Sequence, residues 1–301
     1  MYTKCGDIPP TIAFELFDKM VLPILTYGSE IWGYQYYDTI ESVHFSYCKY
    51  VIGLSSNAPN MAVLGECGRY PIFISTYIKM LCYWFKLLQM NVTRLPNATY
   101  TVLYNLDENG KTNWVTHLKW LLFKYGFGLV FICQGVGDTK CFIDEFKDRL
   151  KSCFQQEWSS DINNMSKLKT YCTFKSMLEP EKYLDVVKIK KYRRALSKFR
   201  CSNHNLSIET GRRNNIERID RKCVYCCNRG INVIEDEFHV ITKCQLYSDI
   251  RTKYICYVRN YNTHDFCSLL KTVNPTKLNE LASFLYHVNI IRQQYISSKV
   301  I

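Results

Sequence analysis

Four residues in the last third of the chain have the types and spacing of a metal site. Cys223 and Cys226 form a Cys-x2-Cys pair, and His239 and Cys244 follow, after twelve further residues, as a His-x4-Cys pair. Thiolates and an imidazole in fourfold coordination favour Zn²⁺, and four protein ligands leave no open position for water or substrate. The spacing therefore predicts a structural zinc site, with Zn²⁺ as the cofactor.

The ligand set has alternatives close by. Cys227 could replace Cys226, because a Cys-x3-Cys pair also suits zinc. Cys201 and His204 form a second potential ligand pair upstream, although we interpret His204 as a hydrogen-bonding loop residue. In a chain with fifteen cysteines, a chance pair of buried free thiols is the alternative to any metal site.

Positive charge is concentrated just before the metal motif. The chain carries a formal net charge of +12, and residues 188–222 contain twelve basic and three acidic residues, which leaves +9 in this segment. Such a field favours polyanions, and aromatic side chains beside it can stack on bases. For Tyr225, stacking on a base and packing within the zinc module are equally open. We predict contacts to RNA or DNA, with weak sequence specificity, from Lys190, Lys191, Arg194, Lys198, Arg212, Arg213, Arg218, Arg221 and Tyr225.

The elements that must position these residues are expected to be helices. The basic residues fall on a predicted amphipathic helix over residues 184–200 and on a loop over 201–213. Residues 91–113, rich in Asn and Thr, predict another loop, and the glycines of 126–137 predict plain turns. Apolar residues recur at helical spacing over 12–24, 40–54, 74–88, 114–121 and 143–158, with a last helix over 278–297.

Part of the chain resembles a known family. Phe199–His204, Ile208–Ile216, the Cys-x2-Cys pair and Asp236–Cys244 are similar to the C-terminal end of non-LTR (LINE-type) retrotransposon reverse transcriptases of invertebrates. The N-terminal stretch Leu16–Gly33 resembles the segment that follows the polymerase palm and enters the thumb. Phe45–Gly53, Gly65–Pro71 and the predicted helix after them continue the match, so the resemblance covers nearly the whole chain and is weakest over residues 91–165.

The resemblance implies a mainly α fold: a helical thumb-like bundle followed by a helical linker and a small zinc-knuckle module. It implies a thumb-like domain over 1–95, a linker over 96–182, the basic helix, loop and CCHC knuckle over 183–250, and C-terminal helices over 251–301. In this family the thumb and the zinc region are thought to grip template–primer and element RNA or target DNA. The implied partners are therefore RNA, DNA or both.

The resemblance does not imply catalysis by these residues. Polymerases of this family hold two Mg²⁺ ions on paired carboxylates in the palm, whereas no two of the thirteen Asp residues here are adjacent. Motifs of serine hydrolases and zinc proteases are also missing. We expect a non-enzymatic nucleic-acid-binding fragment, with a zinc-stabilised protein-interaction scaffold or a non-functional translated pseudogene fragment as alternatives.

The N-terminal residues and the apolar stretches predict the compartment. No apolar segment follows Met1, which argues against a secretory signal, and no apolar run reaches the length of a membrane span. We therefore expect an intracellular protein of the nucleus, the cytoplasm or both, without a membrane partner and with reduced cysteines. Its oligomeric state is left open, and the chain is expected to be the tail of a larger protein.

Overall fold

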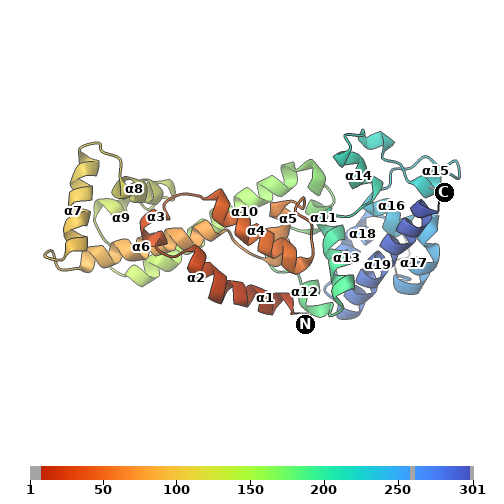
Figure 1. Ribbon diagram of the computed structural model, residues 1–301, viewed down its shortest axis with the longest axis horizontal. Coiled ribbons are helices and arrows are strands. Elements are labelled where there is room, and N and C mark those ends of the chain that lie inside the picture. The colour runs from red at the N-terminus through yellow and green to blue at the C-terminus, as the bar shows by residue number, and fades with distance from the viewer. Residues whose placement is uncertain (1–7, 258–261, 299–301) are drawn as a thin grey trace, which may run out of the picture. The chain divides into compact units, whose positions relative to one another are not determined.

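The structure is a computed structural model that describes residues 8–257 and 262–298 (Figure 1). The described residues are mainly helical, which confirms the predicted mainly α fold. Their extended pairings are two isolated bridges, Cys67 with Pro180 and Lys222 with Ile234. The residues fall into two compact units: unit 1 contains 8–15, 45–69 and the described residues from 158 onward, and unit 2 contains 16–44 and 70–157. The four consecutive domains expected from the sequence stay a prediction.

Unit 2 is organised around one long apolar helix, α6. Trp84 is fully buried on this helix, and its ring lies 6.1 Å from that of Phe131. Its indole N–H donates to the Tyr100 hydroxyl at 3.0 Å, which in turn donates to Gln134. The elements of unit 2 are the π-helix η1 (Phe17–Val21), α2 (Leu22–Leu25), α3 (Ser29–Trp32), the start of α4 (Asp38–Ile52), α6 (Ile72–Gln89), α7 (Leu95–Glu108), α8 (Trp114–Lys124), α9 (Gly128–Ile132) and most of α10 (Thr139–Asn164).

Two expectations for unit 2 were wrong. Residues 91–113 contain the fourteen-residue helix α7 in place of a continuous loop, because Pro96 suits a first helical turn and Tyr100 gains a buried partner in Trp84. The glycine-rich stretch 126–137 contains the short helix α9. Pro23 stands in the first turn of α2, where its missing N–H costs nothing, and the π-helical turn η1 immediately precedes that helix.

Unit 1 is built on the packing of α13 against α19 (Figure 1). Leu196 and Phe199 of α13 and Phe284 and Leu285 of α19 are buried. Among the described residues of the whole chain, no helix is long and apolar enough to cross a membrane. The helices of unit 1 are α1 (Pro10–Leu16), the end of α4, α5 (Asn60–Cys67), the end of α10, η2 (Ser166–Leu168), α11 (Tyr171–Phe174), α12 (Tyr183–Val186), α13 (Lys190–Arg200), α14 (Ser207–Arg213), η3 (Arg218–Asp220), α15 (Val224–Cys227), α16 (Glu237–Thr242), η4 (Gln245–Tyr247), α17 (Ser248–Tyr254), α18 (Thr263–Leu270) and α19 (Pro275–Ser297).

The basic region of unit 1 differs locally from expectation. The predicted helix over 184–200 is broken into α12 and α13, because Val187 takes an extended conformation and its carbonyl accepts a hydrogen bond from Arg193 Nη1 at 2.9 Å. The predicted loop over 201–213 contains the helix α14. Gly211 stands in this helix where a Cβ would approach Arg221 Cγ to 2.6 Å, so a side chain there would displace Arg221.

A buried cation joins three segments of unit 1. Arg200, the last residue of α13, is 4% exposed, and its Nε and Nη2 donate to the fully buried carboxylate of Glu66 at 2.8 and 3.1 Å. Nη2 also pairs with Glu181 at 2.8 Å, and Nη1 donates to the carbonyl of Leu270 at 2.5 Å. These bonds pair the positive charge of Arg200 with carboxylates and a carbonyl inside the protein. A buried charge is tolerated when it is paired in this way.

We expect Arg200→Met to lower the free energy of unfolding of unit 1 by about 3–5 kcal/mol, because Glu66 would keep a buried charge without its main partner. Native-state hydrogen exchange at amides of α5 and α13 would measure this destabilisation without requiring the two units to unfold together. The matched control is Arg218→Met, which removes an exposed arginine 4.0 Å from Asp236 and should cost at most about 1 kcal/mol. Equal destabilisation in the two variants would contradict the assigned role of Arg200.

Candidate metal centre and basic surface

Two short helices present the metal-ligand candidates. Cys223 precedes α15, and its backbone N–H donates to the carbonyl of Val233 at 2.8 Å, which closes the turn through Gly230. Gly230 takes a φ of +77°, a left-handed conformation that suits glycine. On the second side, Asp236 caps α16 by accepting the N–H of His239 at 2.9 Å.

The four candidate ligand atoms converge on one point. Cys223, Cys226, His239 and Cys244 are all buried, and their ligand atoms lie within 4.8 Å of one another. Cys244 Sγ lies 3.9 Å from each of the other two sulfurs, and Cys226 Sγ lies 3.4 Å from His239 Nε2. A tetrahedral zinc ion with Zn–S of about 2.3 Å and Zn–N of about 2.0 Å would set these separations at about 3.8 Å between sulfurs and about 3.5 Å between sulfur and nitrogen. The group could therefore hold a metal ion.

The three thiols lie close enough to shift one another's pKa. A hydrogen bond from Cys244 lowers the pKa of Cys223 to about 4, and the same bond raises the pKa of Cys244. Burial raises the pKa of Cys226 to about 11. A bound divalent cation would stabilise all three thiolates and would therefore lower the pKa of each thiol.

The alternative ligands lie outside this group. Cys227 Sγ is 3.8 Å from Asn232 Oδ1, and Cys201 is fully buried elsewhere in unit 1. His204 Nε2 is 3.0 Å from Glu237 Oε1, so His204 occupies the hydrogen-bonding position expected for it. His204 and Thr170 together lower the pKa of Glu237 although burial opposes them.

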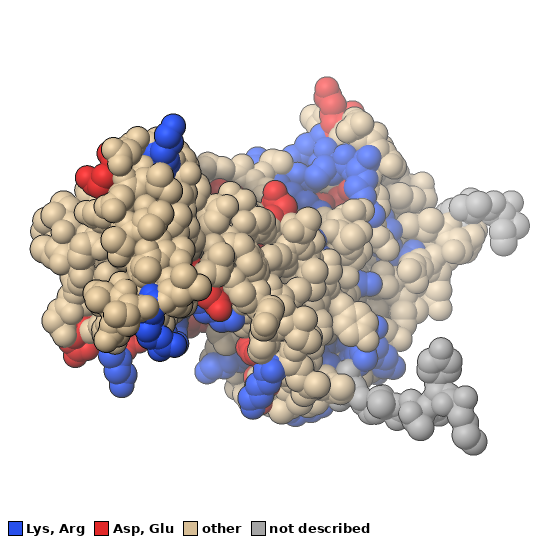
Figure 2. All heavy atoms as spheres, turned by 60° about the vertical axis from the view of Figure 1, so that its left-hand side comes forward, with Lys and Arg blue, Asp and Glu red and all other residues tan. Residues whose placement is uncertain are grey.

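A basic cavity, here called the α14 cavity, lies beside this metal group. Its volume is about 230 Å³, and it brings together three arginines predicted to bind nucleic acid, Arg212, Arg218 and Arg221. Lys167 and Lys169, which the sequence did not single out, also line it. Figure 2 shows Lys and Arg gathered in one dense patch at its upper right. The carboxylates that line the same cavity are Glu209, Asp236 and Glu237.

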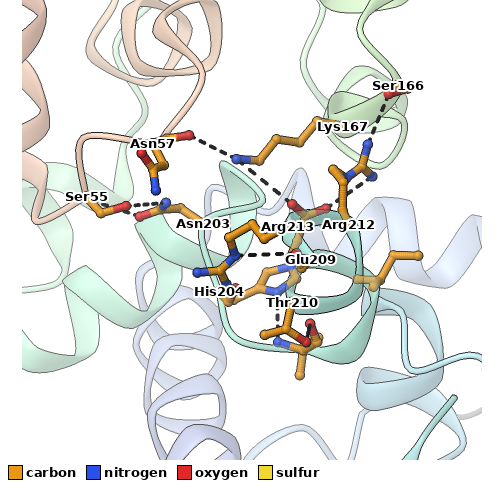
Figure 3. Close-up of polar contacts among 12 residues, drawn as sticks. Ser55, Asn57, Ser166, Lys167, Asn203, His204, Glu209, Thr210, Arg212 and Arg213 are labelled. Carbon is orange, nitrogen blue, oxygen red and sulfur yellow. Dashed lines mark hydrogen bonds and ion pairs between the residues drawn. The ribbon is translucent and has the colours of Figure 1, made fainter. Parts of the chain in front are cut away.

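The cations of the α14 cavity crowd one another. The buried carboxylate of Glu209 pairs with Arg212 at 3.2 Å and lies 3.9 Å from Lys167 (Figure 3). Burial, followed by repulsion from Arg212 and Arg213, lowers the pKa of Lys167 despite its attraction to Glu209. Arg212 Nε is buried without a hydrogen-bond partner among the described residues. An added anion would relieve this repulsion.

Arg221 is the most constrained of the three arginines. Its Nε donates to the carbonyl of Ile216 at 2.9 Å, and its Nη1 donates to the carbonyl of Ile208 at 3.1 Å. These bonds tie Arg221 to the first turn of α14 and to the segment that follows this helix. Arg221 therefore shapes the cavity wall and has less freedom than Arg218, which is exposed.

The other predicted residues do not line the α14 cavity. Lys198 and Arg213 share a separate cavity, and Lys191 lies over the ring of Tyr286 at 4.8 Å. Tyr225 packs edge-on against Tyr295 and lies 3.7 Å from the Arg229 guanidinium, which matches the packing alternative and leaves base stacking a prediction. Lys190 and Arg194 line neither cavity.

Sequence reasoning missed Lys167 and Lys169 because they lie in a polar stretch about twenty residues before the basic segment. One local feature of the sequence could have indicated these two lysines. Leu168 lies between Lys167 and Lys169, is fully buried and anchors η2. An apolar anchor flanked by two lysines turns both side chains away from the core. Charge density alone could not show that η2 packs near α14.

Comparisons of the chain with protein-family models, with curated proteins and with solved structures found no match.

We expect purified protein to bind one metal ion per chain, and Cys244→Ser to weaken metal binding by more than about 100-fold, since it removes a ligand and not merely an outer partner. Metal content after dialysis, together with the visible absorption of a Co²⁺-loaded sample, would measure both effects. Cys227→Ser is the matched control, because it makes the same change outside the group. Equal metal content in the two variants would exclude the assigned ligand set.

Proposed function

We propose that this chain is the non-catalytic C-terminal part of a non-LTR retrotransposon reverse transcriptase and that it binds RNA or DNA through the basic surface of unit 1. In this proposal a structural Zn²⁺ holds Cys223, Cys226, His239 and Cys244 together. The sequence likeness described above supports the family. The basic surface and the metal group support the binding.

The observation that carries the proposal is the direct connection between the metal group and the cations. Asp236 bonds the backbone of His239 at 2.9 Å, and its other carboxylate oxygen lies 4.0 Å from Arg218. The carbonyl of Arg221, two residues before Cys223, accepts the N–H of Glu235 at 2.9 Å. A metal that fixes the loop would therefore also fix the cations of the α14 cavity.

The charges of the cavity favour phosphate over a neutral ligand. Five cationic side chains line it against three carboxylates, and Glu209 is already shared between Arg212 and Lys167. Lys169 and Arg218 are exposed and can reach a strand on the surface. Contacts of this kind neutralise phosphates without reading bases, which accounts for binding with weak sequence specificity.

Zn²⁺ would act here as a structural ion. Three thiolates and an imidazole complete a tetrahedral set, and when bound the ion supplies the cross-link between the α15 turn and α16. The chain's own residues then perform the binding: Lys169, Arg212 and Arg218 present cations, and Arg221 keeps the cavity wall in place.

We expect Lys169→Glu to weaken binding of a single-stranded RNA and to reduce the salt dependence of that binding, with a slope lower by about 0.7 for each phosphate that the variant no longer neutralises. Fluorescence anisotropy over a series of salt concentrations would measure affinity and slope together. Lys147→Glu is the matched control, because Lys147 is equally exposed and belongs to unit 2. It makes the same change in net charge and should leave the slope unaltered.

Chelation of the metal should weaken RNA binding in the same assay. Affinity that does not change with salt, or that survives complete removal of the metal, would overturn the proposal. Capture of a protein partner that resists nuclease and is insensitive to Lys169→Glu would favour the interaction scaffold instead.

A further inference from the structure

A second cavity in unit 1, here called the α13–α19 cavity, has a different chemical character from the α14 cavity. Its volume is about 210 Å³, and it is lined by residues of α13, α14, α19 and the loop 201–206, together with Ser55. One part of its wall is apolar, formed by Phe199, Leu285 and Val288 among others. The remaining wall is polar, and Figure 3 shows four of its residues, Ser55, Asn203, His204 and Arg213.

The charged groups of this wall are all cations. Lys198, Arg213 and Arg292 line the cavity, and no carboxylate does. The charge of Arg292 is neutralised by Glu235, which does not line the cavity and accepts hydrogen bonds from Arg292 Nε and Nη2 at 2.8 and 2.7 Å. Lys198 is exposed and has no partner among the described residues. Arg213 is held by three hydrogen bonds of 3.3–3.4 Å to neutral oxygens. Two cations are thus available to an anion.

The polar wall is held rigidly before any ligand arrives. Asn203 accepts the backbone N–H of Ser55 at 2.9 Å and donates to its hydroxyl at 2.8 Å. His204 is fixed between Glu237 at 3.0 Å and the N–H of Leu206 at 3.4 Å, which places the ring proton on Nε2. A preorganised wall lowers the entropic cost of binding.

The size and polarity of the cavity select the ligand. A dry cavity of about 150 Å³ is enough for a benzene ring, so about 210 Å³ admits a single nucleobase and excludes a base pair. The apolar wall suits the face of a base, and Asn289, an exposed amide without a partner among the described residues, can bond its edge. The phosphate of that nucleotide, joined to the base through the sugar, would lie near Lys198 and Arg213, which are both exposed.

We propose that the α13–α19 cavity binds one unstacked nucleotide of a single-stranded nucleic acid, with the base inside and the adjoining phosphate on Lys198 and Arg213. The inference rests on the proposed function, since it identifies where that strand inserts a base. Recognition of this kind requires a single strand, because a duplex keeps its bases stacked and paired.

Binding measurements with three small ligands separate the contributions of base and phosphate. The ligands are adenosine monophosphate, adenosine and ribose phosphate. We expect adenosine monophosphate to bind the full chain about tenfold more tightly than ribose phosphate, since stacking one base is worth that much or more. Lys198→Gln should weaken binding of adenosine monophosphate and leave that of adenosine unchanged. Asn289→Trp puts a much larger side chain at an exposed position of the cavity lining and should weaken both. Gln293→Trp, exposed on the same helix outside the cavity, is its control.

A thiouridine-substituted RNA strand then tests whether the cavity serves a strand. Ultraviolet cross-linking should map to Phe199, His204 or Asn289, and Asn289→Trp should abolish these cross-links while Gln293→Trp preserves them. Salt-dependent RNA binding with all cross-links outside the cavity would overturn this inference and leave the proposed function standing. Binding of adenosine monophosphate without binding of any RNA would overturn both and assign the cavity to free nucleotides.

Discussion

The need to compensate the buried charge of Arg200 organises unit 1. A guanidinium that is 4% exposed must find carboxylates and carbonyls within the protein, and it finds them on Glu66, Glu181 and Leu270. These partners come from α5, from the segment before α12 and from the end of α18. Since Arg200 ends α13, its bonds fix where the basic helix stops and where the loop 201–206 begins. The α13–α19 cavity depends on that placement, because residues of this loop line it.

The same constraint divides the basic segment into two classes of cation. Arg193 and Arg200 are buried and bonded internally, so their charges contribute to folding. Lys198, Arg213 and Arg218 remain at the surface, where a polyanion can reach them. Part of the +9 counted over residues 188–222 therefore never faces solvent. The α14 cavity also contains cations from outside this segment, namely Lys167 and Lys169.

Helix α14 supplies one arginine to each of the two cavities. Successive residues of an α-helix point about 100° apart, so Arg212 lines the α14 cavity and Arg213 lines the α13–α19 cavity. The first cavity combines cations with carboxylates and suits a backbone phosphate. The second combines cations with an apolar wall and suits a whole nucleotide.

The helices with clear apolar periodicity, such as α6 and α10, could be predicted from the sequence because their spacing directly reflects burial. Helices α7 and α14 could not, since Asn, Thr and Gly weaken their local signal and long-range partners stabilise them. Tyr100 bonds Trp84, and Arg221 packs on Gly211. The break between α12 and α13 likewise depends on a side chain, Arg193, that bonds a backbone carbonyl.

The metal-ligand candidates could be read from the sequence alone, because Cys-x2-Cys and His-x4-Cys are local patterns whose geometry follows from one turn and one short helix. Tertiary packing settled that these pairs converge, that Cys227 lies apart, and which cations share a cavity. The physical reason is the distance along the chain over which each feature is determined. The spacing of neighbouring residues determines local geometry, such as that of a turn or a helix face. Cavities instead form where segments far apart in the sequence pack together to bury apolar surface and pair charges.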